Sequence, residues 1–415
     1  MTPLYVIGFL SSLGFSIVIP FLVFLVTRFG GNAFVLGAIG AAFSAAQFFG
    51  SSWLGPLSDR IGRKRVLVRC QIGALAAWAI FLVAVYIPRT ALFDVDTGLT
   101  GAFTLTVPLL LIALSRVTDG LFNGSVSVAN AYVADATSGP AQKVAFGRLA
   151  IANNLGFVTG PALAGLIART NGGIVVIVAT ALLLSASAAA LAKFRLPEAT
   201  PTPTPDATPQ TTAVLGTGCR AAVKHPPSRW RLLFDSRELL KLIAIYFLVF
   251  LGFSMFASTL PVHAEQDLHW QSSELGILFT VLAGALVVTE WLLLPWFAKH
   301  VRDAWLGAVG SLIVAISYAL MATHSSIALY TGAVCYGVGN GLSWPSYLAM
   351  LARSGSPSQH GMIQGIGSSA GSIASVVGML ASGVMFEAIG ASTFFISAGA
   401  LAITTAIFFT SSDAD

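Results

Sequence analysis

Charged residues are scarce in this sequence. Asp, Glu, Lys and Arg together make up 9% of its 415 residues, whereas hydrophobic residues make up 56%. In soluble globular domains about a quarter of the residues are charged. Because so few charges do not cover the surface of a soluble domain of this length, the composition excludes that class and predicts an all-α polytopic membrane protein.

Cysteine is also scarce, and the signatures of other protein classes are missing. The three cysteines, Cys70, Cys219 and Cys335, are far apart and form no C-x-x-C motif, which argues against a disulfide framework or a zinc site. The chain has no G-x-x-x-x-G-K-[ST] phosphate-binding loop, which argues against an ATP-driven pump. We therefore expect no enzyme activity, no catalytic residue, no cofactor and no metal site.

Long apolar segments recur along the whole chain. Each is about 20 residues or longer, which is enough to cross a bilayer core of roughly 30 Å as a helix. We predict twelve transmembrane helices, at residues 4–27, 34–57, 66–88, 104–134, 144–168, 173–194, 239–261, 274–297, 304–323, 326–351, 361–386 and 391–411.

The basic residues indicate the orientation of these helices. With the N-terminus placed in the cytoplasm, 18 of the 22 Lys and Arg residues fall in inner loops and span ends. Three fall on the outer side (Arg28, Arg89 and Arg169), and Arg116 lies within a span. Positive charge concentrates on the cytoplasmic side of membrane proteins. The N- and C-termini are therefore predicted to be cytoplasmic, and the net charge of +5 is explained without nucleic-acid binding.

A Pro/Thr-rich stretch divides the chain between the sixth and seventh predicted helices. Its sequence, PEATPTPTPDATPQTT at 197–212, is typical of an extended or disordered segment. We predict an N-terminal six-helix bundle at 1–195, a cytoplasmic linker at 196–238 and a C-terminal six-helix bundle at 239–415.

The two predicted bundles look related by duplication. The fifth helix contains three glycines that recur 218 residues later in the eleventh helix. These are Gly147, Gly160 and Gly165 in the first bundle and Gly365, Gly378 and Gly383 in the second. With the linker between them, the halves are expected to be pseudo-symmetric, as in transporters built from repeats.

A dense group of charges follows the second predicted helix. Five of the seven residues from Asp59 to Arg65 are charged, in the segment GPLSDRIGRKR. Gly55–Lys64 matches the loop signature G-x-L-x-D-R-x-G-R-K of the major facilitator superfamily at every fixed position, and the chain resembles that family over its whole length. The resemblance implies the major facilitator fold and alternation between inward-open and outward-open states.

Three further motifs resemble those of exporters in this family. RVTDGLFNG, at 116–124, is similar to the fourth-helix R-x-x-x-G-x-x-x-G motif. YVADAT, at 132–137, is similar to the end of helix four in tetracycline-type efflux pumps. The fifth-helix motif, which is associated with exporters that exchange substrate for protons, is matched by Gly156, Gly160, Pro161 and Gly165. The nearest branch resembles the twelve-span drug:proton antiporters.

The charged segment is predicted to form a cytoplasmic gate that holds the outward-open state. Asp59 is expected near the N-terminus of helix eleven, around Gly361, where the helix dipole favours a carboxylate. Gly62 permits a sharp turn, and Gly55 permits close helix approach. The predicted gate residues are Gly55, Asp59, Arg60, Gly62, Arg63, Lys64 and Asp135. The alternative is a basic anchor on the inner side, which requires neither Asp59 nor the glycines.

Charges inside the predicted helices are few and mark a candidate site. A charge at the bilayer centre costs about 2.5–3.5 kcal/mol on insertion scales, so such groups face the protein interior. Arg116 and Asp119 are spaced to pair on one helix face, and Glu290 has no cation nearby in sequence. We predict these three as proton-coupling residues. Many members carry an acidic residue in helix one, and this chain has none there.

Other polar and aromatic residues within the predicted helices are candidates for the substrate cavity. Those of helix ten recur at helical spacing and form an aromatic side that suits a planar or cationic lipophilic substrate. The candidates are Gln47, Asn123, Asn130, Asn153, Tyr336, Asn340, Trp344 and Tyr347. For the polar residues that follow Arg116 on one face of the fourth helix, the alternative is a structural role in hydrogen bonds between helices. For the aromatic residues of helix ten, the alternative is a position at the lipid interface.

Beyond the seventh predicted helix lies a cluster of His263, Glu265, Asp267 and His269. We interpret it as an exposed acidic loop and not as a metal site.

The predicted function is a secondary active transporter that exports a small lipophilic molecule or drug in exchange for protons. The alternative is a symporter or facilitator for a sugar, lipid or metabolite on the same fold. The predicted partners are the substrate, protons and the lipid bilayer, without nucleic acid, and the chain is expected to be a monomer. A bacterial cytoplasmic (inner) membrane is the predicted location.

Overall fold

The computed structural model describes residues 1–137, 139–168, 173–198, 237–353 and 360–412. The predicted linker therefore lies mostly outside the described residues. The elements of the first half are α1 (Thr2–Ser16), α2 (Ile19–Arg28), α3 (Ala33–Ile61), α4 (Arg63–Tyr86), β1 (Ala91–Thr97), β2 (Gly101–Thr106), α5 (Val107–Asn123), α6 (Ser125–Ala136), α7 (Gly139–Ala168) and α8 (Gly173–Arg195). Those of the second half are α10 (Arg237–Gln266), α11 (Ser272–Val288), the π-helix η1 (Thr289–Leu293), α12 (Leu294–His300), α13 (Asp303–Met321), α14 (Ser326–Arg353), α15 (His360–Ile389), η2 (Gly390–Ser392) and α16 (Thr393–Ser412).

Long apolar helices dominate the structure, as the composition predicts. A helix pairs all of its backbone N–H and C=O groups within itself. This is required in the bilayer core, where no water is present to bond unpaired groups. Among the described residues, ten segments are long and apolar enough to cross a membrane, and one of them, Gly365–Phe409, contains both α15 and α16. Helix α14 is not among the ten, so the count of twelve spans stays a prediction.

Several helices are interrupted near glycine or proline. The first predicted span is divided into α1 and α2 just before Pro20, and the fourth is divided into α5 and α6 at Gly124. The eighth contains η1, which ends just before Pro295. Proline has no N–H to donate to the preceding turn, and π-turns inside α-helices are frequent at functional sites.

A β-hairpin connects α4 to α5, and the sequence analysis did not predict it. Strands β1 and β2 pair antiparallel, from Ala91 opposite Thr106 to Thr97 opposite Gly101. The predicted start of the fourth span at residue 104 is wrong, because that residue lies in β2 and α5 begins at Val107. Thr104 and Thr106 favour a strand, and Pro108 is placed in the first turn of α5, where its missing N–H costs nothing.

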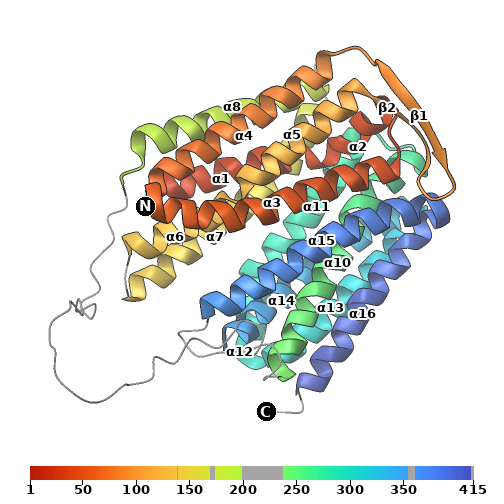
Figure 1. Ribbon diagram of the computed structural model, residues 1–415. Helices are drawn as coiled ribbons and strands as arrows, with labels where there is room; N and C mark the ends of the chain where they lie inside the picture. Colours follow the sequence, from red (N-terminus) through yellow and green to blue (C-terminus); the bar gives the residue numbers. More distant parts are fainter. Residues whose placement is uncertain (138, 169–172, 199–236, 354–359, 413–415) are drawn as a thin grey trace, which may run out of the picture.

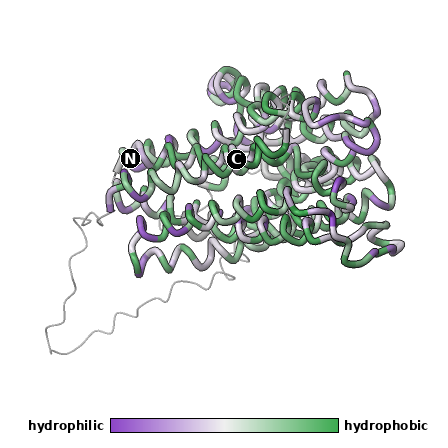
Figure 2. The backbone as a smooth tube through the Cα atoms, turned by 90° about the horizontal axis from the view of Figure 1, so that it is seen from above, coloured by the Kyte–Doolittle hydropathy of each residue, from purple (hydrophilic) through white to green (hydrophobic). Residues whose placement is uncertain are grey.

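The helices form two groups that lie side by side, α1–α8 and α10–α16 (Figure 1). The groups meet mainly along α3 with α15 and along α7 with α11. We call the end of the molecule that carries β1 and β2 the hairpin end. The opposite end, where α8 ends and Gly62 joins α3 to α4, we call the Gly62 end. Hydrophobic residues line the length of the helices, and hydrophilic residues gather at their ends (Figure 2).

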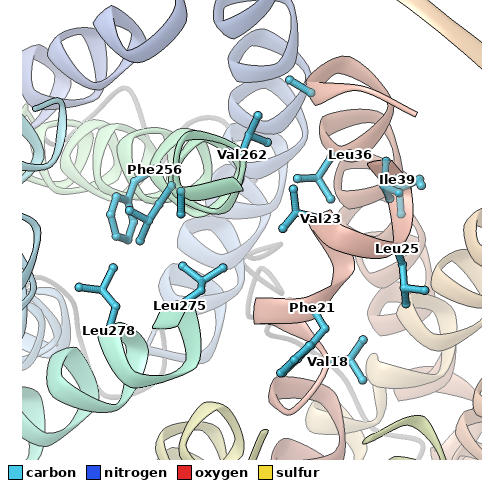
Figure 3. Close-up of a cluster of buried hydrophobic side chains, with 14 of the residues drawn as sticks. Val18, Phe21, Val23, Leu25, Leu36, Ile39, Phe256, Val262, Leu275 and Leu278 are labelled. Atoms are coloured by element: carbon cyan, nitrogen blue, oxygen red, sulfur yellow. The ribbon is translucent and has the colours of Figure 1, made fainter. Parts of the chain in front are cut away.

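The buried apolar cores differ between the two ends. One large core at the hairpin end includes side chains of both halves, such as Val23 and Leu36 of the first and Phe256 and Leu275 of the second (Figure 3). Toward the Gly62 end there are two cores, one made only of first-half residues and one only of second-half residues. The halves are thus packed together at the hairpin end and separate toward the Gly62 end.

Candidate functional site

A cavity of about 410 Å³ lies between the two halves. One wall is formed by first-half aromatic residues, in which Phe15 stacks on Phe43 with ring centroids 5.0 Å apart. The other wall is formed by the second half, where Phe256 stacks on Tyr318 at 4.7 Å and on Tyr336 at 5.2 Å. An aromatic cavity of this size suits a lipophilic ligand with flat rings.

A few polar groups interrupt the apolar lining. Two of them are charged residues of opposite sign from opposite halves, Arg116 of α5 and Glu290 of η1. The others are Asn154, Ser258, Asn340 and Ser343. Few polar groups in an otherwise apolar cavity orient a ligand and select it.

Arg116 is buried in the first half, and its charge is balanced locally. Its side chain is 5% exposed, and Nη1 lies 3.2 Å from Oδ2 of Asp119. The guanidinium carbon lies 4.3 Å from the ring centroid of Trp78 and 5.1 Å from that of Phe81, so both rings contribute cation–π attraction. The i,i+3 pairing predicted from the sequence is present.

The Arg116–Asp119 pair is incompletely satisfied. Asp119 is 6% exposed, and neither its Oδ2 nor Nε of Arg116 has a hydrogen-bond partner among the described residues. The ion pair is therefore close but not aligned as a hydrogen bond. Unsatisfied buried charges are costly, and this pair has spare capacity to bind a proton, a water molecule or a polar group of a ligand.

Glu290 is positioned by the π-helix. It lies in η1, which an α-helical reading of the sequence does not predict, and it lines the same cavity as Arg116. The π-turn changes the direction in which side chains project, relative to a regular α-helix. The structure thus brings Arg116 and Glu290 to one cavity although they are far apart in the sequence.

The predicted cavity residues divide into two sets. Tyr336, Asn340 and Trp344 line the cavity. The remaining five are outside its lining among the described residues: Gln47, Asn123, Asn130, Asn153 and Tyr347. Two of these occupy contacts inside one half. Asn153 packs on Gly8 of α1, and Tyr347 is 2% exposed and stacks on Trp344 at 5.7 Å.

Sequence reasoning missed most of the aromatic lining. Phe15, Phe43, Phe157, Phe250 and Phe253 all line the cavity. A phenylalanine in a membrane helix is ordinary wherever it points, so no sequence signal separates these from lipid-facing ones. Only the packing of the two halves places them together.

The predicted gate residues form a network at the Gly62 end. Arg63 donates through Nε to Asp135 Oδ2 at 2.7 Å and through Nη1 to Ser58 Oγ at 2.6 Å, and it forms an ion pair with Asp59. Arg60 is exposed, and Lys64 is half-buried at the start of α4. Arg63 therefore ties the end of α3 to the end of α6.

Among the described residues, no hydrogen bond or ion pair joins Asp59 to helix α15. Its side chain is 60% exposed, and the residues of α3 that pack on Met379 of α15, Gly37 and Gly40, lie at the hairpin end of α3. The predicted contact of Asp59 with helix eleven belongs to the outward-open state, so it stays a prediction.

The glycines of the gate segment have different roles. Gly62 alone connects α3 to α4, with a φ of +100°. Only glycine adopts this conformation without strain, so the sharp turn expected there is present. The close helix approach expected at Gly55 is wrong for this structure, because an added Cβ would meet only Ser127 Oγ at 3.9 Å. Gly55 precedes Pro56 inside α3. Because glycine has no Cβ, it avoids the steric clash that the proline ring makes with the preceding residue of a helix.

Replacing Gly62 with alanine is expected to lower the free energy of unfolding by about 1–3 kcal/mol, because a Cβ is strained at this φ. Gly147→Ala is the control. Gly147 is exposed inside α7, and an added Cβ would meet nothing within 4 Å, so this change is expected to stabilise by up to about 1 kcal/mol. Unfolding in detergent, followed by tryptophan fluorescence, measures both. Equal stability of the two variants would contradict the prediction.

The fifth-helix motif lies on α7 and makes two kinds of contact. Gly156 and Gly160 pack on α1, where Ser16 Oγ donates to the carbonyl of Gly156 at 3.2 Å. Pro161 lines the cavity. Gly165 packs on the other half: a Cβ on Gly276 of α11 would lie 2.7 Å from Gly165 Cα. The backbones of α7 and α11 thus touch at the hairpin end.

The related glycine in the second half makes the corresponding contact. A Cβ on Gly383 of α15 would lie 2.8 Å from Phe34 Cα at the start of α3. Gly165 and Gly383, the pair that recurs at a spacing of 218 residues, therefore both close the hairpin end. The duplication inferred from the sequence coincides with two equivalent helix crossings.

The acidic cluster after the seventh predicted helix is an exposed loop only in part: Asp267 and His269 are exposed beyond the end of α10, whereas His263 and Glu265 lie within it. Helix α10 continues to Gln266, and His263 is fully buried. Its Nδ1 lies 2.6 Å from Asp267 Oδ2, and its Nε2 lies 3.2 Å from the carbonyl oxygen of Thr323. The prediction was wrong for His263, because its contact with Thr323 joins α10 to the end of α13, and the sequence does not place those ends together. No group of residues suited to a metal ion occurs in the described part of the chain.

Two packed halves of apolar helices around a central cavity, closed at one end, define the class of membrane transporters that work around a central binding site. The sequence profile of the Major Facilitator Superfamily matches residues 4–300 and 242–414 of this chain. The chain therefore belongs to the Major Facilitator Superfamily. The predicted helical membrane fold of this family is confirmed, whereas the twelve spans and the cytoplasmic termini stay predictions. The protein is an integral membrane transporter and not an enzyme.

Individual relatives include proteins named for drug resistance. The chain is 26% identical over 384 residues to Major facilitator superfamily domain-containing protein 10 of Mus musculus, covering 88% of this chain and 76% of that protein. It is 24% identical over 408 residues to Multidrug resistance protein 1 of Bacillus subtilis (96% and 92% covered). It is 22% identical over 385 residues to Tetracycline resistance protein, class D, of Salmonella ordonez (92% and 88% covered). These relatives confirm the predicted resemblance to the drug-efflux branch.

Solved structures share the fold. The crystal structure of the human organic anion transporter MFSD10 (TETRAN) superimposes with a TM-score of 0.66 at 22% sequence identity, covering 98% of each chain.

Proposed function

We propose that this protein is a secondary transporter that works by alternating access and exports a small lipophilic molecule or drug in exchange for protons. The observation that carries the proposal is the central cavity, in which Arg116 with its partner Asp119 faces a space shared with Glu290 and otherwise lined by aromatic rings. The cavity combines titratable groups with a lipophilic binding surface, which are the two parts that a drug:proton exchanger needs.

The state of the molecule supports alternating access. The distribution of basic residues supports a cytoplasmic Gly62 end, and both termini and the linker at 196–238 would lie on that side. The common core at the hairpin end and the separate cores toward the Gly62 end then correspond to an inward-facing conformation. Rocking the halves about the cavity would open the hairpin end, and the Asp59 gate would hold that second state.

Proton coupling is assigned to the intramembrane carboxylates. A proton carrier needs an environment that differs between the two states. Asp119 is buried beside Arg116 here, and rocking of the halves would change the surroundings of this pair at the cavity and with them the proton affinity of Asp119. Glu290, on the opposite half, is the second carrier candidate. One inward proton releases about 2.3 kcal/mol per 100 mV and about 1.4 kcal/mol per pH unit, enough to sustain a substrate gradient of roughly several hundredfold.

The substrate class rests on the cavity and on the names of the relatives. Stacked rings on both walls favour flat, lipophilic compounds. Glu290 favours a cationic group and Arg116 an anionic one, and relatives are named for multidrug resistance, tetracycline resistance and organic anion transport. We propose a monomer in a bacterial cytoplasmic membrane, with no nucleic-acid partner.

Proton movement in proteoliposomes tests this function. The protein is reconstituted with an internal pH dye and challenged with a lipophilic cation, a tetracycline and an organic anion. We expect one of them to drive proton movement in the wild type, and we expect Asp119→Asn or Glu290→Gln to abolish it. The other variant is expected to retain part of the movement.

The control is Glu238→Gln, which removes a half-exposed carboxylate paired with Lys241 at the start of α10, outside the cavity. It is expected to behave like the wild type. If labelled compounds cross down their gradients while no proton moves, proton exchange is refuted, and the protein is a facilitator or is driven by another ion.

A further inference from the structure

At the hairpin end, a carboxylate of the second half caps a helix of the first half. Helix α3 begins at Ala33, and Asn32 caps it locally, because its side chain accepts the Val35 amide at 3.1 Å. The Ala33 amide, which Asn32 does not cap, donates to Oε1 of Glu387 at 3.0 Å. The Phe34 amide is also directed to this carboxylate. Glu387 lies near the end of α15, in the other half.

The surroundings of Glu387 keep it in this position. Glu387 is exposed as a whole residue, but its carboxylate touches the hairpin, since a Cβ on Gly101 would lie 3.0 Å from the carboxyl carbon of Glu387 and 3.0 Å from Asn32 Nδ2. Asn32 in turn donates to the carbonyl of Thr100 at 2.6 Å. The hairpin, the start of α3 and the end of α15 therefore form one hydrogen-bonded unit that includes both halves.

The geometry points to Glu387 as the positioning residue that holds the hairpin end closed in the inward-facing state. This inference rests on the alternating access of the proposed function and concerns its regulation. A contact stabilises one conformation only when it is made in that conformation and not in the other. Opening the hairpin end moves α15 from the start of α3, so the amides lose their anionic partner and the positive end of the α3 dipole is left uncompensated.

The arrangement is reciprocal to the predicted cytoplasmic gate. Asp59 lies near the end of α3 and is predicted to face the start of α15, whereas Glu387 lies near the end of α15 and caps the start of α3. The same two helices would then carry one carboxylate for each closed state. A second polar contact between the halves lies at the same end, where Thr27 Oγ1 of α2 is 3.4 Å from Glu265 Oε2 of α10, although the Thr27 hydroxyl is closer to the carbonyl of Val23, at 3.0 Å.

Distance measurements between spin labels test the inference in the full chain in nanodiscs. The native cysteines are replaced by serine. One label pair, Thr90→Cys with Ser325→Cys, spans the hairpin end with one exposed site in each half. The second pair, Arg195→Cys with Lys299→Cys, spans the Gly62 end in the same way. We expect Glu387→Ala to lengthen the first distance and shorten the second.

The expected shift in the ratio of outward-open to inward-open protein lies between about twofold and about thirtyfold, the range that helix-capping contacts supply. Glu387→Gln, which keeps the shape and an acceptor oxygen, separates loss of charge from loss of folding and is expected to give a smaller shift. The matched control is Glu274→Gln. Glu274 is also a capping carboxylate near the hairpin end, but it accepts the Gln271 amide of its own helix at 2.8 Å.

Three outcomes are distinguishable. A reciprocal shift in the Glu387 variants but not in Glu274→Gln supports the inference. Unchanged distances in folded Glu387→Ala, while the wild type responds to tetraphenylphosphonium or tetracycline with reciprocal changes, overturn it and leave the proposed function intact. Distances that never change reciprocally in the wild type refute alternating access, and the gate with it.

Discussion

Replacing Arg116 with glutamine is expected to lower the free energy of unfolding by about 3–5 kcal/mol, because it leaves the buried Asp119 without its cation. The two side chains are only 5% and 6% exposed, and the Arg116 guanidinium also lies over Trp78 and Phe81, so glutamine removes both the charge that balances Asp119 and the cation–π contacts. Transport is expected to be lost as well. Reversible unfolding in mixed micelles and uptake into proteoliposomes measure the two effects.

A double-mutant cycle separates pairing from simple loss of packing. Arg116→Gln combined with Asp119→Asn removes both charges, so the double variant is expected to recover much of the stability that either single variant loses. Lys241→Gln is the control: its i,i+3 partner Glu238 lies at 3.0 Å, but the side chains are 32% and 50% exposed, and such surface pairs contribute about 0–1 kcal/mol. Additive losses for Arg116 and Asp119 would show that they do not stabilise each other.

Replacing Gly276 with leucine is expected to reduce transport at least about tenfold, because it prevents closure of the hairpin end. A Cβ on Gly276 would lie 2.7 Å from the Gly165 backbone of the other half, so α7 and α11 must separate to admit a side chain. The variant is expected to remain outward-open. Uptake into proteoliposomes, together with labelling of a cysteine at cavity position Ser258 by a reagent added from the outside, measures both consequences.

Gly284→Leu on the same helix is the matched control. Gly284 is exposed, and an added Cβ would meet nothing within 4 Å, so the same substitution there adds a side chain without separating the halves. Wild-type transport by Gly276→Leu, or an equal loss in Gly284→Leu, would rule out the crossing of α7 and α11 as the closing contact.

The two closing devices are of different kinds. The glycine crossings at Gly165 and Gly383 allow the halves to approach, and in a lipid environment close backbone packing is a main source of helix association. Glu387 adds a directional interaction that exists only when the approach is complete. The free energies of the inward-facing and outward-open states must stay close for the protein to alternate between them. Packing of modest strength, together with a Glu387 contact that is made in one state only, meets this requirement.

The sequence by itself determined the membrane class, most helix positions and the family. These follow from local requirements: a helix must be apolar over the bilayer thickness, and a glycine such as Gly62 permits a sharp turn between two helices. The pairing of Arg116 with Asp119 was also predictable, because residues three apart on a helix are neighbours.

Only the tertiary structure decided which faces of those helices meet. Phe15 and Phe256 look like any phenylalanine of a membrane span until the two halves place both on one cavity. Glu387 and the buried His263 carry no local signal that they contact Ala33 and Thr323, because those partners are distant in sequence. The cavity, its closed end and the cap on α3 are properties of contacts between the halves, and composition and periodicity describe one helix at a time.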